Sequence, residues 1–145
     1  MPLHLLKLCV GTDSIQDLED WIEEMRTHDH RLGRPYEQKH TTRMVPKRLG
    51  EIAGQGSLYW VIKGQLSCRQ AILAIRPFTD EGGIGRCHIV LEPVVVPVSP
   101  RPVRPFQGWR YLAAKDAPAD IGARGDDVGQ MPEELRRELA LLGLL

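Results

Sequence analysis

The chain opens with apolar side chains in a pattern typical of a strand. They dominate residues 3–10, a run without proline or glycine, and Gly11 ends it. The next three residues, at 12–14, are all of the types that cap helix N-termini. Beyond them, apolar residues recur at three- and four-residue steps with acids in between: Ile15, Leu18, Ile22 and Met25. We therefore predict a strand followed by one long helix with an acidic outer face.

Shorter extended runs fill the middle of the chain. Strands are expected over residues 40–45, 57–63, 66–75, 86–91, 94–98 and 106–112. Pro46 favours a brief helix through Ile52, and Gly64 separates two strand-like runs as a hairpin turn would. Residues 1–115 are thus predicted to form a single α+β domain. Its curved, mainly antiparallel sheet or small open barrel is flanked by one long and one short helix.

The composition changes again near the carboxyl end. Residues 116–130 are polar and contain three glycines, which predicts a flexible linker. Residues 131–145 begin with a proline and two acids and place Leu135, Leu139 and Leu142 on one helical face. We predict an amphipathic tail helix that either docks on the domain or meets a second copy, so a homodimer through the tail stays open.

Composition narrows the class of protein. Of 145 residues, 42% are hydrophobic and 26% are charged, values typical of a soluble folded domain. The three cysteines are too few and too odd in number for a disulfide scaffold. No apolar run is long enough to span a bilayer, and the first residues lack the basic start of an export signal. We expect a cytoplasmic protein with reduced thiols and no membrane association.

Charge is balanced overall but unevenly distributed. The chain has 19 basic and 19 acidic residues, for a formal net charge of +0. Residues 12–30 hold seven acids and one base, whereas residues 39–110 hold eleven bases and four acids. A basic set of strands favours a polyanionic partner, namely RNA or a phosphate-bearing ligand.

One segment concentrates this chemistry. Residues 101–111 contain three arginines, three aromatic residues and no acid, and prolines hold the segment extended. Basic side chains would contact phosphates, and Trp109 or Tyr111 would stack a base. The candidate anion- or nucleic-acid-binding residues are Arg43, Lys63, Arg69, Arg86, Arg104, Trp109, Arg110 and Tyr111. The alternative is that the arginines are ordinary solvated strand residues and the aromatic rings belong to the core.

The sequence shows no catalytic motif. Histidines and cysteines lack metal-ligand spacing, and residues 82–85 are typical of a hairpin turn rather than a phosphate-binding loop. We expect no catalytic residue, metal or cofactor, and interpret the chain as a non-catalytic RNA- or nucleotide-binding module. One alternative is an enzyme acting on an anionic metabolite or nucleotide, with Asp80 or Glu92 transferring protons. Another is a protein-interaction module that uses the acidic helix or the tail helix.

Five segments together resemble a known family. They are residues 1–7, 42–48, 56–64, 83–87 and 104–112. On these segments the chain is similar to a family of short alphaproteobacterial proteins whose function is not established, over about residues 1–120. An early strand and helix followed by basic antiparallel strands is also similar to the small barrels of the PUA and ASCH superfamily. That second resemblance implies a PUA-like barrel and RNA binding, with Lys63 and Arg69 in the region of the ASCH motif.

Overall fold

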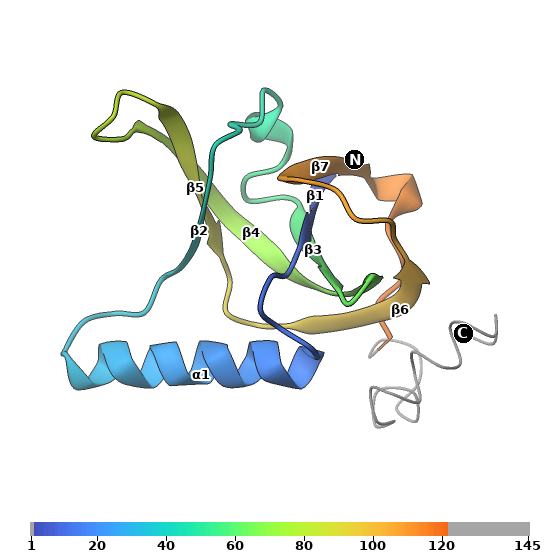
Figure 1. Ribbon diagram of the computed structural model, residues 1–145, viewed down its shortest axis with the longest axis horizontal. Helices are drawn as coiled ribbons and strands as arrows, with labels where there is room; N and C mark the ends of the chain where they lie inside the picture. The colour runs from blue at the N-terminus through green and yellow to red at the C-terminus, as the bar shows by residue number, and fades with distance from the viewer. Residues whose placement is uncertain (1, 122–145) are drawn as a thin grey trace.

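A seven-stranded, open, mixed sheet forms the framework of the computed structural model, which describes residues 2–121 (Figure 1). The strands are β1 (Leu3–Leu8), β2 (Gln38–Thr42), β3 (Ser57–Ile62), β4 (Gln65–Thr79), β5 (Gly85–Leu91), β6 (Val96–Pro102) and β7 (Trp109–Ala113). Their order is β2-β5-β4-β3-β1-β7, with β6 paired to β4. β1 and β3 are parallel, and the other pairs in the described residues are antiparallel. The predicted α+β class and mainly antiparallel sheet are confirmed.

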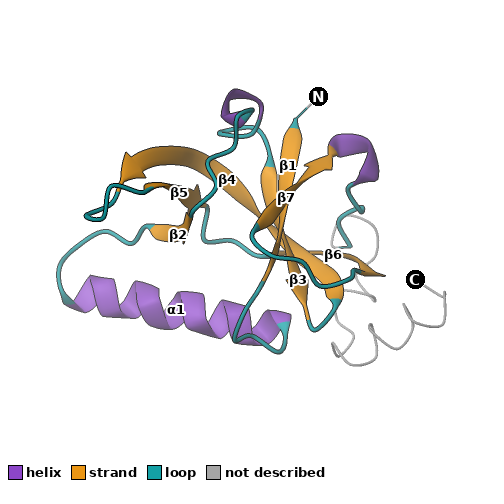
Figure 2. Cartoon of the chain, turned by 45° about the horizontal axis from the view of Figure 1, so that its top comes forward, coloured by secondary structure: helices purple, strands orange, loops and turns teal. Residues whose placement is uncertain are grey.

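The helix α1 (Ile15–Arg31) begins where its capping residues predict. Ser14 is the N-cap, and its hydroxyl accepts a hydrogen bond from the backbone N–H of Asp17 at 3.1 Å. The Asp17 carboxylate accepts a hydrogen bond from the N–H of Asp13, the residue before the N-cap, at 3.2 Å. The Ser14 hydroxyl thus satisfies one of the N–H groups that a helix start leaves open, and Asp17 holds the chain that enters the helix. α1 then buries its apolar stripe against one face of the sheet (Figure 2).

Strand β4 organises the sheet because it pairs with three other strands. Its first half lies between β3 and β6, and its second half pairs with β5. The register against β5 shifts between Ile72 and Ala74. The turn from β3 into β4 has two residues with positive φ, Lys63 at 48° and Gly64 at 78°. This is the geometry of a tight hairpin turn whose twist matches that of the strands.

Two hydrophobic cores lie on opposite faces of the sheet. The larger core packs α1 against side chains of β1, β3, β4 and β5, with Leu5, Trp60 and Ile72 almost fully buried in it. The smaller core, on the other face, includes Tyr59, Val98 and Phe106. Paired residues point to the same face of a sheet, so the alternation of side chains along β1 and β3 feeds both cores. The sheet therefore has a hydrophobic core on each face, and the smaller core covers only β1, β3, the first half of β4, β6 and β7.

Several elements differ from the sequence prediction. β4 continues to Thr79, four residues past the predicted 66–75, and β7 begins at Trp109 rather than at 106. β2 begins at Gln38, two residues before the predicted start at 40, and ends at Thr42. The prediction misplaced this strand because its inward-facing side chains at 38, 40 and 42 are polar and show no apolar alternation. The brief helix is a single 3₁₀ turn, η1 (Leu49–Glu51). β6 runs through three prolines and is paired only along part of β4.

The end of the described chain remains on the domain. A second 3₁₀ turn, η2 (Ala114–Asp116), leads to a bridge between Asp120 and Val98, and Ile121 is buried. The predicted tail helix over 131–145 and most of the predicted linker lie outside the described residues. Within residues 2–121, no helix has the length and apolar character needed to cross a bilayer.

The close approach of β1 and β3 generates a prediction about Gly56. A Cβ atom at this position would lie 2.0 Å from the carbonyl oxygen of Leu3, a contact that requires backbone movement. We expect Gly56→Ala to lower the free energy of unfolding by about 3 kcal/mol. Urea denaturation measures it, with Gly50→Ala as the control because a Cβ there meets nothing within 4 Å. Equal stability of the two variants would contradict the register of β1 and β3.

Candidate functional site

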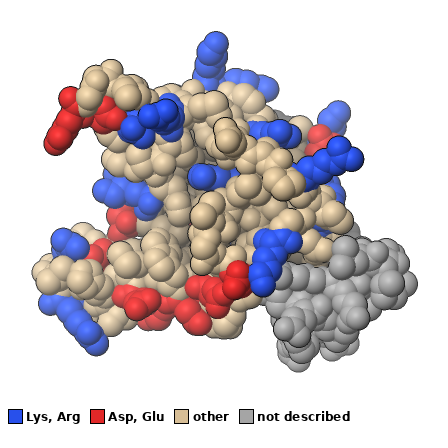
Figure 3. Space-filling view, in the orientation of Figure 1, with Lys and Arg blue, Asp and Glu red and all other residues tan. Residues whose placement is uncertain are grey.

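Charges of opposite sign occupy different parts of the surface. Figure 3 shows acidic side chains along the margin formed by α1 and a second acidic group at the β4–β5 turn, whereas basic side chains are scattered over the rest of the visible face and at the left end of that margin. The separation seen in the sequence thus persists in three dimensions. Which basic side chains are available to a ligand depends on their partners within the protein.

Two of the predicted phosphate contacts are held in close ion pairs. Arg69 binds Asp120 through two hydrogen bonds of 2.8 and 2.6 Å and donates a third, of 3.0 Å, to the Ser57 hydroxyl. The hydrogen bond from Arg69 holds the pKa of the Asp120 carboxyl below its usual value. Arg86 pairs with Asp80 across the β4–β5 turn. Both guanidinium groups therefore have structural roles that the sequence did not reveal.

Asp80, the acid considered for proton transfer, is itself committed to that turn. Its carboxylate accepts hydrogen bonds of 2.9 Å from the backbone N–H groups of Gly82 and Ile84. These bonds, after the larger effect of Arg86, lower the pKa of Asp80. An ionised carboxylate with three donors stabilises the turn and is poorly suited to accept a proton.

Lys63 and Arg104 lie at one end of the sheet. The backbone N–H of Val103 donates to the carbonyl of Gly64 at 2.8 Å, which brings the segment holding Arg104 beside the β3–β4 turn. Lys63 lies 3.8 Å from Asp13, with both side chains mostly exposed. Exposed pairs of this kind contribute little free energy, so the Lys63 ammonium is not strongly bound.

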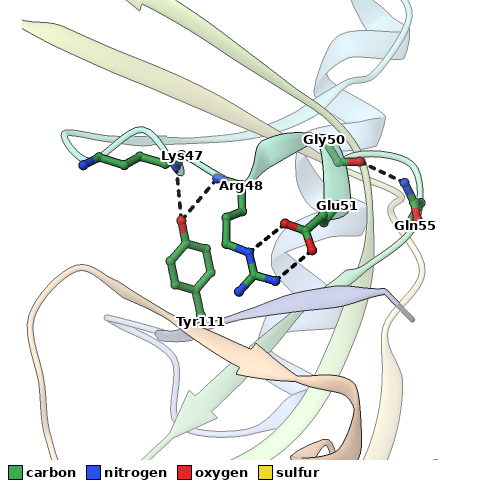
Figure 4. A network of polar contacts seen from close by, with 6 residues as sticks. All are labelled: Lys47, Arg48, Gly50, Glu51, Gln55 and Tyr111. Carbon is green, nitrogen blue, oxygen red and sulfur yellow. Dashed lines mark hydrogen bonds and ion pairs between the residues drawn. The ribbon is translucent and has the colours of Figure 1, made fainter.

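Trp109 and Tyr111 both hold a loop in place, Trp109 from a buried position and Tyr111 with 40% of its surface exposed. Trp109 is 8% exposed, and its Nε1–H donates to the Met44 carbonyl at 2.8 Å. The Tyr111 hydroxyl accepts from the backbone N–H groups of Lys47, at 3.1 Å, and Arg48, at 3.4 Å (Figure 4). Loop 43–48 is therefore pinned to β7 by three hydrogen bonds. The Trp109 ring is not accessible for stacking in this arrangement.

The same pinning places two basic side chains, Arg43 and Lys47 of loop 43–48, on the side of the edge strand β7 that carries Trp109 and Tyr111. Arg110 points to the opposite side of β7, with its guanidinium carbon 4.6 Å from the centre of the Phe106 ring. All three are exposed, and none forms an ion pair within residues 2–121. Neighbouring Arg48 differs because Glu51 binds it through two hydrogen bonds of 2.7 Å. We call Arg43, Lys47 and Arg110 the basic edge.

Sequence reasoning missed a hollow of about 410 Å³ between α1 and the strands. Trp21 of α1, His40 of β2 and Trp60 of β3 line it, together with Lys7 and Asp17. The His40 ring lies edge-on to Trp60 at 4.8 Å and tilted against Trp21 at 6.3 Å, measured between ring centres. One sequence feature could have indicated this hollow. The inward-facing residues of β2 are polar, and packing in a hydrophobic core does not explain polar side chains at these positions.

A buried amide network fixes two of these rings. The Oε1 of Gln70 accepts from Trp60 Nε1 at 2.9 Å and from Gln38 Nε2 at 3.2 Å. Gln70 Nε2 donates to Gln38 Oε1 at 2.8 Å and to the carbonyl of Glu92 at 3.0 Å. Gln38 Nε2 also lies 3.4 Å from His40 Nε2. Because an amide nitrogen only donates, this contact requires Nε2 to accept, with the proton on Nδ1.

Electrostatics agrees with a neutral imidazole. Burial, assisted by the nearby Lys7 ammonium, lowers the pKa of His40 to about 4. His40 is therefore uncharged at neutral pH and can act as a hydrogen-bond donor and acceptor, but not as a cation for phosphate. Lys7 supplies the positive charge of the hollow.

The lowered pKa of His40 predicts a pH-dependent stability. Unfolded His has a pKa of about 6.5, so between that pH and about 4 the unfolded state binds more protons than the folded state. The free energy of unfolding should fall as pH falls through this window, with His40 contributing at most about 3 kcal/mol. Urea denaturation at several pH values should show a shallower fall for His40→Asn, and the wild-type fall for His28→Asn, whose side chain is exposed. A wild-type slope in His40→Asn would contradict the network.

Comparison with known proteins identifies a family without a known activity. The family model described as "Protein of unknown function (DUF1489)" matches residues 5–145. The match continues past residue 120, so the resemblance seen in the sequence was drawn too short. No curated protein and no solved structure matches the chain. The chain belongs to the DUF1489 family of proteins of unknown function.

Proposed function

We propose that this chain is a non-catalytic RNA-binding module whose basic edge holds the phosphate backbone of a single strand. The observation that carries the proposal is the loop 43–48 pinned to β7. It sets exposed Arg43 and Lys47 on one side of the edge strand β7, whose other side carries exposed Arg110, and none of the three has a carboxylate partner in the described residues.

Two physical properties support this assignment. Phosphate contacts by lysine and arginine release counterions, which supplies most of the sequence-independent affinity for nucleic acid. A loop already held by hydrogen bonds to the side chains of Trp109 and Tyr111 loses little further conformational entropy when a ligand binds. Arg69 and Arg86 make a smaller contribution in this proposal because their carboxylate partners would compete with phosphate.

Salt dependence tests the proposal directly. The full chain, freed of copurified nucleic acid, should bind short mixed-sequence single-stranded RNA with an affinity that falls steeply between about 50 and 200 mM salt. Each phosphate contact to a single strand contributes about 0.7 to the slope of log affinity against log salt. The triple variant Arg43→Gln, Lys47→Gln and Arg110→Gln should therefore reduce that slope by about 2.

A matched variant separates local contacts from net charge. The control is a second triple variant that removes the same charge near the C-terminal end of α1: Arg26→Gln, Arg31→Gln and Arg34→Gln. Its salt slope should stay close to that of the wild type. If both triple variants changed the slope equally, the basic edge would have no special role. If the wild type did not bind at low salt, the proposed function itself would be wrong.

A further inference from the structure

The hollow between α1 and the strands combines a flat aromatic wall with a rigid floor. Trp60 is 1% exposed and is held by Gln70, so the floor is fixed before any ligand arrives. Trp21 is 41% exposed, which leaves much of its ring area open to solvent. An open indole beside a fixed floor suits a flat ligand, because planar rings gain most by stacking face to face with an offset.

Lys7 makes the hollow more specific than an aromatic slot. It is a half-buried lysine that lines the hollow and forms no ion pair within residues 2–121. The register of β1 places it beside Trp60 on the same face of the sheet. No carboxylate of the described residues lies within ion-pair distance of the Lys7 ammonium, so an anionic group on a ligand would give it a direct partner.

The remaining polar groups match a ligand with both donors and acceptors. Asp17 offers a carboxylate, Thr12 offers a hydroxyl, and His40, with Nε2 directed to Gln38, retains Nδ1–H as its donor. The volume of about 410 Å³ is near the lower end of the range for small-molecule sites. A ring of nucleobase size with one phosphate meets all three requirements: planarity, negative charge and hydrogen-bonding edges.

We propose that this hollow binds one nucleotide unit, with its base stacked on Trp21 and its phosphate at Lys7. The choice of a nucleotide as the ligand rests on the proposed RNA-binding function. The evidence for a flat anionic ligand, namely the aromatic wall and the unpaired lysine, does not depend on that function. The unit is either a free mononucleotide or one residue of an RNA strand. β2 connects the two surfaces, because His40 in the hollow is three residues before Arg43 of the basic edge, about 10 Å along an extended chain.

Calorimetric titration of the full chain with the four nucleoside 5′-monophosphates tests the inference. At least one should bind with a Kd below about 1 mM. Trp21→Leu should weaken binding of that nucleotide and of its uncharged nucleoside by about tenfold. Lys7→Gln should weaken binding of the nucleotide but not of the nucleoside. Leu73→Ala removes an exposed apolar side chain outside the hollow and should change neither.

A second measurement needs no variant. The chain has three tryptophans, so its indole N–H signals are readily assigned. Saturation with nucleotide should shift the signals of Trp21 and Trp60 more than that of Trp109, which pairs with Lys7 across β1 and β7 but whose N–H donates to Met44. Binding that shifts only Trp109, or no binding of any of the four nucleotides, would overturn a free-nucleotide site.

RNA titrations with the same variants distinguish the two proposals. If RNA binds the wild type, Trp21→Leu and Lys7→Gln equally well and no mononucleotide binds, the hollow inference fails while the proposed function stands. If a mononucleotide binds in the hollow and RNA binds no more tightly than that mononucleotide, the proposed RNA-binding function fails and the ligand is a free nucleotide. Weaker RNA binding by Trp21→Leu, with an unchanged salt slope, supports the inference for a nucleotide within a strand.

Discussion

The arrangement of the sheet depends on the hydrogen bonds of the Gln70 side-chain amide. The amide lies where β4 stops pairing with β3 and begins to pair with β5, and it is fully buried. Its two acceptor and two donor positions are all used, by Trp60, Gln38 and the carbonyl of Glu92. A buried amide is tolerated only when it is satisfied in this way, so the site admits one arrangement of β2, β3 and the β5–β6 connection.

The network also sets the electrostatic character of the hollow. Because Gln38 donates toward His40, a protonated imidazole would face a second donor, and burial disfavours the charged form as well. The hollow thus contains a neutral histidine, one lysine and the Asp17 carboxylate beside two indole rings. On the edge of the sheet, Trp109 and Tyr111 have the complementary role of holding a basic loop in place. Structural polar contacts therefore create both proposed binding surfaces.

Sequence reasoning succeeded where local pattern determines structure. The spacing of Ile15, Leu18 and Ile22 predicted α1, and Gly64 predicted the β3–β4 turn. It failed where partners are distant in the chain. Arg69 and Asp120 are 51 residues apart, and Trp109 and Met44 are 65 apart, so neither the ion pair nor the covered indole has a local signature. The hollow was missed for the same reason, because it needs residues from α1, β1, β2 and β3 together.

The central claim is that a nucleic acid follows β2 from the hollow to the basic edge. Photocrosslinking of the full chain to RNA containing 4-thiouridine, followed by mass spectrometry of the linked peptides, tests it most directly. The account predicts crosslinks in residues 7–21, at the hollow, and in residues 40–48, along β2 and the pinned loop. Crosslinks confined to other segments, such as the β4–β5 turn, would contradict it.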